Sequence, residues 1–474
     1  MPGFSAYKRT NYTGLPHNTN RDIENMPKKY TIDFCNGPIF SKLVLFSLPL
    51  IGMLLLQLAF NTADYMVVGR FASSKALAGV GATSSLTNLL TMFFFGLSVG
   101  GNVVASNAFG AKDMTLLRNT ARTSFTVAVA GGFALGMIGV IACPYLLKMM
   151  NTPPEILPLS IKYMRILFSG MVFTSAYNFG AAFLRAVGDT RRPLVFLTFA
   201  GIVNVVLNVI FVVFFHRDVD GVAFATVVSK AISAILVWMT IARMDEVNGL
   251  PLSKLRINWQ IFGRMLGIGV PSGLQSFSFN IANIVIQTCM NSFGPLVLAG
   301  YIAARSLDSL LSAVDAGFHQ TAISFSAQNV GGKKFSRLKK GTIYCCVTAT
   351  VTMGVLSLLM LCFGRQLLSL YGKAEPGVIE WGLKRLAVML PFYFSGGLMN
   401  ALTGTMRGSG HSTAAFVIVL FGACFFRIGW ILLVFPMHRT MGMLLLALPL
   451  SWILISIGCV IFLWRAFRKL SDQC

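Results

Sequence analysis

Apolar segments long enough to cross a bilayer follow one another along most of the chain. A hydrocarbon core of about 30 Å requires roughly 20 apolar residues per helix. The first half has six such segments, at 43–69, 77–108, 119–142, 158–184, 193–215 and 221–242. The second half has six more, at 265–293, 296–327, 341–363, 382–404, 412–436 and 442–464. This pattern predicts an all-α polytopic membrane protein with twelve transmembrane helices.

The two sets of six segments resemble each other. When the chain is aligned with itself at an offset of 222 residues, Pro49 matches Pro271 and Asn61 matches Asn283. Further matches at 221 or 222 are 77–79 with 298–300, 110–112 with 331–333, and 184–188 with 406–410. Six spans per repeat is an even number, so both halves enter the bilayer from the same side. We therefore expect two parallel six-helix lobes, related by an axis along the membrane normal, around a central cavity that opens alternately to either face.

The polar segments divide the chain into five parts. We expect a cytosolic amino-terminal tail at 1–35, an amino-terminal lobe at 36–242, a charged cytosolic linker at 243–262, a carboxy-terminal lobe at 263–464 and a cytosolic tail at 465–474. Lys and Arg are most frequent in the tails and in the loops on the same side of the bilayer as the tails. Since cytosolic loops retain these residues, the pattern predicts a multi-pass protein of the inner or plasma membrane with both termini in the cytosol.

Composition agrees with a membrane protein: 55% of the residues are hydrophobic, 12% are charged, and the mean hydropathy is +0.71. A net charge of +23 would suit a nucleic-acid partner only if the cations gathered on one folded face. They lie instead in short loops between apolar segments, so no nucleic-acid partner is expected. The nine cysteines are scattered without CxxC spacing, which indicates neither a zinc site nor a disulfide framework.

Motifs of catalysis and of ATP-driven transport are missing. The sequence contains neither HExxH nor GxSxG, so we expect no enzyme, and it lacks GxxxxGK[ST]. Any energy for transport must then come from an ion gradient. A receptor would not require a six-helix repeat.

Four blocks of sequence resemble one transporter family. They are SLPLIGMLLLQLAFNTADYMVVGRF followed by ALAGVG, then LSVGGNVVASNAFGAKD, then YNFGAAFLRAVGDTRRP, and finally NVVLNVIFVV with GVAFATVVSK. In this order they resemble the multidrug and toxin extrusion (MATE) family, over about residues 36–466. The resemblance implies a monomeric two-lobe helical bundle in the lipid bilayer. It would take up H⁺ or Na⁺ and export small organic molecules, commonly amphipathic cations, with no cofactor beyond the coupling ion.

The resemblance also implies a buried polar network in the amino-terminal lobe. Carried over to this sequence, the network consists of Asp64, Asn178, Asn204, Asn208 and Thr226. This chain departs from the family twice, with Asn208 where many members have an acid and Phe60 where many have Tyr. Asp64 is then the only acid of the network, which places ion coupling through this lobe in question.

Charged residues at membrane depth point to function independently of the family, because burying a charge in lipid is costly. Six were identified: Asp64, Lys230, Arg305, Asp308, Asp315 and Arg427. Asp64 is expected to bind a proton or a Na⁺ ion in one state and to release it in another, the alternative being a static salt bridge. Asn204 and Asn208, like Thr226 and Lys230, are spaced i,i+4 and share a helix face that can converge on Asp64. The alternative for Asn and Thr is hydrogen bonding that holds helices together.

The carboxy-terminal lobe is predicted to hold a charged cluster of Arg305, Asp308, Asp315, His319 and Arg427. We expect Arg427 to pair with one of the two acids and both acids to line the cavity between the lobes. The cluster is either a second site for protons or substrate cations or an ion-pair cluster that fixes helix packing. The substrate cavity is expected to include Gln57, Asn61 and Asn283.

The sequence therefore favours a secondary antiporter that exports organic, amphipathic and commonly cationic small molecules in exchange for H⁺ or Na⁺. A flippase for a lipid-linked precursor is the alternative, because such proteins have a strongly cationic cavity and Lys230, Arg305 and Arg427 would contribute to one.

Overall fold

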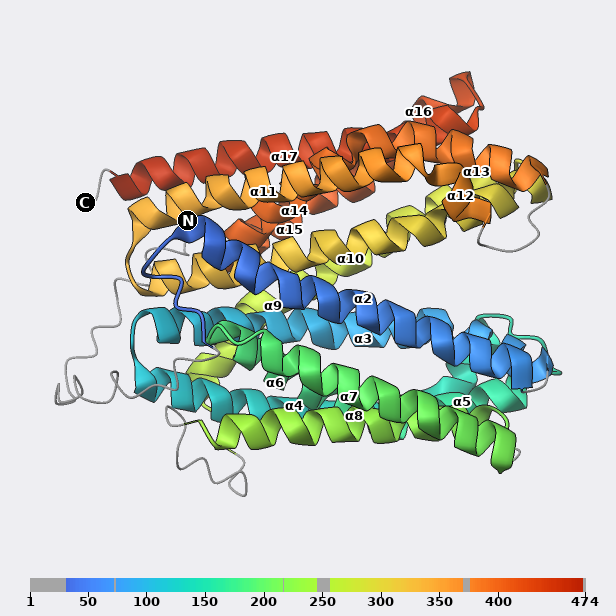
Figure 1. The fold of residues 1–474 in the computed structure, drawn as a ribbon, viewed down its shortest axis with the longest axis horizontal. Coiled ribbons are helices and arrows are strands. Elements are labelled where there is room, and N and C mark those ends of the chain that lie inside the picture. Colours follow the sequence, from blue (N-terminus) through green and yellow to red (C-terminus); the bar gives the residue numbers. More distant parts are fainter. Residues whose placement is uncertain (1–30, 72–73, 216, 245–255, 370–375, 472–474) are drawn as a thin grey trace.

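The computed structural model describes residues 31–71, 74–215, 217–244, 256–369 and 376–471. Throughout these residues the secondary structure is helical, and no strand occurs in them. The segment that leads into the first helix and the end of the last helix lie at the same end of the bundle (Figure 1), which we call the termini end.

The amino-terminal half contains six long helical units. They are α2 (Ile39–Phe71), α3 (Ser74–Gly110), α4 (Met114–Met149), the pair α5 (Leu157–Ser169) and α6 (Met171–Ala186), α7 (Arg191–Val209) with the π-helical turn η1 (Ile210–Phe214), and α8 (Val219–Ala242). The pair α5 and α6 is bent by 47° and forms one broken span.

The carboxy-terminal half repeats this plan. Its units are α9 (Trp259–Asn291), α10 (Pro295–Gly331), α11 (Phe335–Cys362) with the short α12 (Gly364–Ser369), α13 (Pro376–Met389) joined through η3 (Leu390–Phe392) to α14 (Tyr393–Gly408), α15 (Ser412–Val419) with the π-helical η4 (Leu420–Phe425), α16 (Phe426–Leu433) and η5 (Phe435–Met437), and α17 (Met441–Ser471). Each of the twelve predicted segments therefore corresponds to one unit, and the predicted fold class is confirmed.

Helices α3 and α9 form a close contact between the two halves. Among the described residues, nine helices are long and apolar enough to cross a membrane, and the bent pair makes up to ten. The remaining two, α3 and α9, pack against each other so closely that a Cβ on Gly96 would lie 2.5 Å from the Cα of Gly273. Small residues permit such close helix contacts in membranes.

Backbone conformation reproduces the internal repeat. Lys112 and Lys333 both have positive φ, at 58° and 54°, in the turns after α3 and α10. Gly188 and Gly410 have φ of 91° and 83° in the turns after α6 and α14. A left-handed conformation is uncommon for Lys, so its recurrence at matching positions shows that the halves share local geometry as well as sequence.

At the termini end the two halves are closed against each other. A Cβ on Gly110 would lie 1.9 Å from the carbonyl oxygen of Gln328, and a Cβ on Gly331 would lie 2.0 Å from that of Asn107. These are matching positions of the two repeats, so α3 and α10 cross symmetrically here. Only glycine allows backbones to approach this closely.

The residues just before α2 lie over this crossing. Ile32 donates its backbone N–H to the carbonyl of Gly188 in the first half, and Phe34 donates its own to Oε1 of Gln328 in the second half. Phe34 is fully buried, and Arg337 donates to its carbonyl oxygen. Residues 31–35, the last part of the segment predicted as an amino-terminal tail, are thus packed against both halves. The remainder of the predicted tail, 1–30, lies outside the described residues.

Helix α7 has one exposed apolar face and one buried polar face. Val195, Phe199, Ile202 and Val206 are exposed and follow one another at helical spacing. On the opposite side, Asn204 and Asn208 are buried. The apolar stripe faces lipid and the two amides face the other helices.

Candidate functional site

A small polar cavity lies inside the amino-terminal half, among α2, α7 and α8. Its volume is about 50 Å³, enough for a few water molecules or one ion. The side chains that line it are Gln57, Phe60, Asn61, Asp64, Leu197, Ala200, Gly201, Asn204, Thr226, Ser229, Lys230 and Ser233. On α2 the polar members are spaced i, i+4 and i+7, which places them on one helix face.

Asp64 accepts a hydrogen bond from the amide of Asn208 across α2 and α7. The distance from Asn208 Nδ2 to Asp64 Oδ1 is 2.6 Å, and Asn208 also donates to Asn204 Oδ1 at 3.4 Å. The other amide atoms, Asn208 Oδ1 and Asn204 Nδ2, are buried without a hydrogen-bond partner among the described residues. Buried polar atoms are normally paired, so these two indicate a place for water or an ion beside the carboxylate.

Lys230 brings a cation to the same cavity without forming an ion pair. In the described part of the chain no nitrogen–oxygen contact within 4.0 Å joins Lys230 to Asp64, and Lys230 Nζ lies 5.6 Å from the centre of the Tyr177 ring. The two residues line one cavity, as their helix faces indicate, but they form no ion pair there. The Asp64 carboxylate therefore has no ion-pair partner among the described residues, and its hydrogen bond comes from Asn208.

Hydroxyl groups of α8 complete the cavity. Thr226, Ser229 and Ser233 donate to backbone carbonyls of their own helix, so their oxygens remain as acceptors. Across from them, Gly201 of α7 lies against the ring of Phe60, where a Cβ would be 2.0 Å from the nearest ring carbon. The described residues contain no group of three or more His, Cys, Asp or Glu side chains that could hold a metal ion. A Na⁺ ion here would depend on oxygens of Asp64, Asn204 and Asn208.

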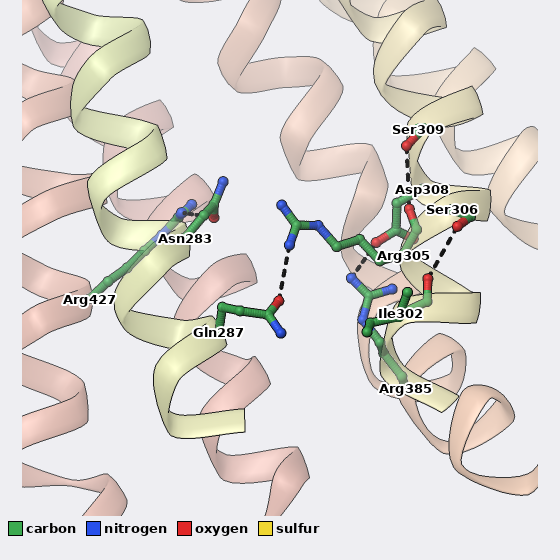
Figure 2. A network of polar contacts seen from close by, with 9 residues as sticks. All are labelled: Asn283, Gln287, Ile302, Arg305, Ser306, Asp308, Ser309, Arg385 and Arg427. Atoms are coloured by element: carbon green, nitrogen blue, oxygen red, sulfur yellow. Dashed lines mark hydrogen bonds and ion pairs between the residues drawn. The ribbon is translucent and has the colours of Figure 1, made fainter. Parts of the chain in front are cut away.

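In the carboxy-terminal half, two arginines contact one face of α9. Arg427 of α16 has an exposed fraction of 1% and donates from Nη1 to Asn283 Oδ1 at 3.5 Å and from Nε to Ser451 Oγ at 2.9 Å. Arg305 of α10 is exposed and donates from Nη1 to Gln287 Oε1 at 3.1 Å. Figure 2 shows both side chains extending toward this face of α9.

The acids of α10 have other partners than those predicted. Asp308 forms a buried ion pair with Arg385 of α13, whose guanidinium also lies 4.8 Å from the centre of the Tyr301 ring. Asp315 accepts a hydrogen bond from the amide of Asn400 on α14. The predicted pairing of Arg427 with one of these acids is therefore wrong, because both carboxylates face the α13–α14 unit of their own half instead of the α9 side.

The family model named MatE matches this chain twice, at residues 49–210 and 271–431. The two matches begin 222 residues apart and cover most of both halves, as the internal repeat requires. The chain belongs to the MatE family. It is thus a multi-pass membrane transporter of the multidrug-efflux family that the sequence resembles, and not an enzyme.

Several relatives of this MatE protein match most of its length. A probable multidrug resistance protein of Bacillus subtilis, YpnP, is 28% identical over 396 residues, 82% of this chain and 86% of the relative. A protein of Shewanella oneidensis named as an FAD transporter is 25% identical over 90% of this chain and 94% of its own. Among solved structures, one described as the outward-facing conformation of a multidrug resistance MATE family transporter has a TM-score of 0.86 at 20% identity, covering 93% of this chain and 99% of that one. The structural likeness shows the fold.

Most of the site residues predicted in the amino-terminal half lie at or beside the small cavity, but two predicted site residues of the MatE chain lie elsewhere. Asp64, Asn204, Thr226 and Lys230 line the small cavity together with Gln57 and Asn61, and Asn208 bonds to Asp64 beside it. Asn178 lies on α6 and is not among the lining residues, and Asn283 lies in the other half beside Arg427.

The predicted carboxy-terminal cluster is divided into separate contacts. Arg305 binds Gln287, Asp308 binds Arg385, Asp315 binds Asn400, and Arg427 binds Asn283 and Ser451. His319 lies one turn beyond Asp315 against Gly404 of α14, and its Nε2 is buried without a hydrogen-bond partner among the described residues.

Arg385 and Asn400 were not predicted from the sequence. Arg385 lies near the start of the predicted span 382–404, where cations commonly reach the head groups. Its neighbour Lys384 is exposed and pairs with Glu380 at the surface. The signal that distinguishes them is helical spacing: Arg385 is one turn before the buried Met389 and next to the buried Leu386.

Proposed function

We propose that this MatE protein is a secondary antiporter of the cell membrane that exports amphipathic organic small molecules in exchange for protons bound at Asp64. The observation that carries this proposal is the cavity around Asp64, which holds one carboxylate, unpaired amide atoms and room for an ion. An intramembrane acid in such a place has a function by default.

A proton fits this cavity better than a Na⁺ ion. Lys230 lines the same cavity and would repel a second cation, whereas a proton neutralises the carboxylate without adding a separate charged body. The amide of Asn208 can donate to the ionised carboxylate, as it does here, and rotate to accept from the protonated one. The pair can therefore accommodate both states of Asp64.

The cavity is too small for a drug-sized molecule, which requires about 300 Å³ or more. We place the transported molecule between the two halves. With both termini in the cytosol, the closed crossing of α3 and α10 would be the cytosolic gate, and the cargo space would open outward. Relatives named for multidrug resistance and for FAD transport leave the charge of the cargo open, and no relative described above is named for a lipid-linked precursor.

Transport in inside-out vesicles tests the proposal. Uptake of a fluorescent amphipathic dye is measured with a pH gradient at equal Na⁺ and, separately, with a Na⁺ gradient at equal pH. We expect the pH gradient alone to drive uptake in the wild type and neither gradient to drive it in Asp64→Asn. Uptake driven by Na⁺ alone would replace the proton with Na⁺, and gradient-driven uptake by Asp64→Asn would remove the cavity from the mechanism.

A further inference from the structure

Arg427 is a fully buried cation that the protein itself does not neutralise. Its polar partners, Asn283 and Ser451, are uncharged, and the ring of Phe279 lies 5.5 Å from its Cζ. Within the described residues no carboxylate lies within ion-pair distance of it. A buried charge is costly unless an opposite charge accompanies it. An aromatic ring offsets only part of that cost.

A second cation without a carboxylate faces the same side of α9. Arg305 donates to Gln287, which follows Asn283 by one helical turn, so the two amides lie on one face and each holds a guanidinium. Figure 2 shows the two arginines approaching this face from the two helices on either side of it, α16 and α10. Both amides use their oxygens to accept from the arginines, which fixes the direction of the guanidinium groups.

The acids of the same half do not cancel these charges. Asp308 is neutralised by Arg385. Asp315 is ten residues from Arg305 along α10, which is about 15 Å at the rise of an α-helix, and it bonds to Asn400. The face of α9 that carries Asn283 and Gln287 is therefore positively charged.

We propose that Arg427 and Arg305, held by Asn283 and Gln287, form an anion-binding site, and that the exported molecule is an amphipathic organic anion with a carboxylate, sulfonate or phosphate group. Guanidinium groups bind such groups through paired hydrogen bonds. Phe279, one turn before Asn283, offers an aromatic surface to the apolar part of the molecule. This proposal rests on the proposed function and reverses the cationic cargo that the family resemblance implies.

The test uses two dyes with the same ring system and opposite charge. Fluorescein is an anion at mildly alkaline pH, and rhodamine 123 is a cation. Binding of each to the purified full-length protein in lipid nanodiscs is measured by fluorescence anisotropy. We expect the wild type to bind fluorescein about tenfold or more tightly than rhodamine 123, a difference of about 1.4 kcal/mol.

Asn283→Asp separates an anion site from a purely structural arginine. It supplies a carboxylate at the position that now lies 3.5 Å from the guanidinium, so Arg427 becomes neutralised internally. We expect this variant to lose fluorescein affinity about tenfold while its melting temperature stays the same or rises. Asn280→Asp is the matched control: it adds the same charge on the same helix, where the amide donates to Met92 and Ser276 among the described residues.

Further variants keep the test informative if Asn283→Asp folds poorly. Gln287→Glu neutralises the exposed Arg305 and should weaken fluorescein binding, and Arg427→Lys should retain more of it than Arg427→Gln. Equal binding of both dyes by the wild type, or equal losses in Asn283→Asp and Asn280→Asp, would overturn the anion site.

Vesicle transport separates the two proposals. Proton-driven export of rhodamine 123 but not of fluorescein refutes only the anion site. Fluorescein binding without gradient-driven transport refutes only the antiport.

Discussion

In the amino-terminal half, Asp64 of α2 meets Asn208 of α7, and in the carboxy-terminal half, Asn283 of α9 meets Arg427 of α16. The two contacts join corresponding helices of the repeat, and the members of each are 144 residues apart in the chain. At the repeat offset of 222, Asn283 corresponds to Asn61, one turn before Asp64. One half thus presents a carboxylate held by an amide, and the other presents a guanidinium held by an amide.

Both halves therefore place the same pair of helices in contact, but the charged side chain at that contact is different in each half. Both contacts also lie near a π-helical turn, η1 just after Asn208 and η4 just before Arg427. Such turns leave backbone groups without the regular helical bonds and often occur at functional sites. We infer that the two halves have taken separate tasks, ion exchange in the first and cargo binding in the second.

The largest expected effect is the loss of coupled transport in Asp64→Asn. The substitution preserves size and removes the carboxylate at which we propose that the proton binds. Asp64 has no ion-pair partner within 4.0 Å among the described residues. Gradient-driven uptake should fall to background while the melting temperature stays near that of the wild type. Glu380→Gln, which alters an exposed acid, is the control and should transport normally.

In the carboxy-terminal half, replacing the buried acid Asp308 should lower the stability of the protein, unlike Asp64→Asn. Asp308→Asn and Arg385→Met each leave an uncompensated buried charge, at a cost of about 3 to 5 kcal/mol, whereas the double variant costs much less. Unfolding of the purified variants measures these costs. The exposed pair Glu380 and Lys384 on the same helix is the control, worth about 1 kcal/mol or less. Additive losses in the Asp308 and Arg385 double variant would contradict the ion pair.

Substitutions at the closed end should affect both halves equally. A methyl group on Gly110 or Gly331 meets a backbone oxygen of the other half, so Gly110→Ala and Gly331→Ala should both separate α3 from α10. Cys35 is buried at this crossing, with its Sγ bonded to the carbonyl of Gln328. In a chain that retains Cys35 as its one cysteine, maleimide labelling should accelerate several-fold in both variants. Acceleration in one variant alone would show that the crossing is not symmetric.

The smallest expected effect is a change in pH profile. Lys230 and Asp64 line one cavity without direct contact, so removing the cation in Lys230→Gln should make proton binding by Asp64 modestly easier. The pH dependence of transport should then move upward by a fraction of a unit. Lys162→Gln, at a partly exposed surface pair with Asp220, should leave the profile unchanged. An unmoved profile in Lys230→Gln would show that the two charges act independently.

The sequence alone determined the helices, the repeat and the family. Membrane spans follow from the length and apolarity of continuous segments, which are local properties. Spacing within one helix also brought Asn204 with Asn208 and Thr226 with Lys230 to the same faces. Asn204, Thr226 and Lys230 line the cavity, and Asn208 bonds directly to Asp64. The offset of 222 residues showed the two halves before any contact was known.

The pairing of the buried charged side chains could be read only from the tertiary structure. Asp308 could have turned to Arg305 on its own helix or to Arg427, and it pairs instead with Arg385, which is 77 residues away. The choice depends on where α13 lies against α10, and helix spacing within one segment carries no information about a second helix. For the same reason the unneutralised Arg427 became visible only when α9, α10 and α16 were seen together, because a charge is unpaired only with respect to all the helices that surround it.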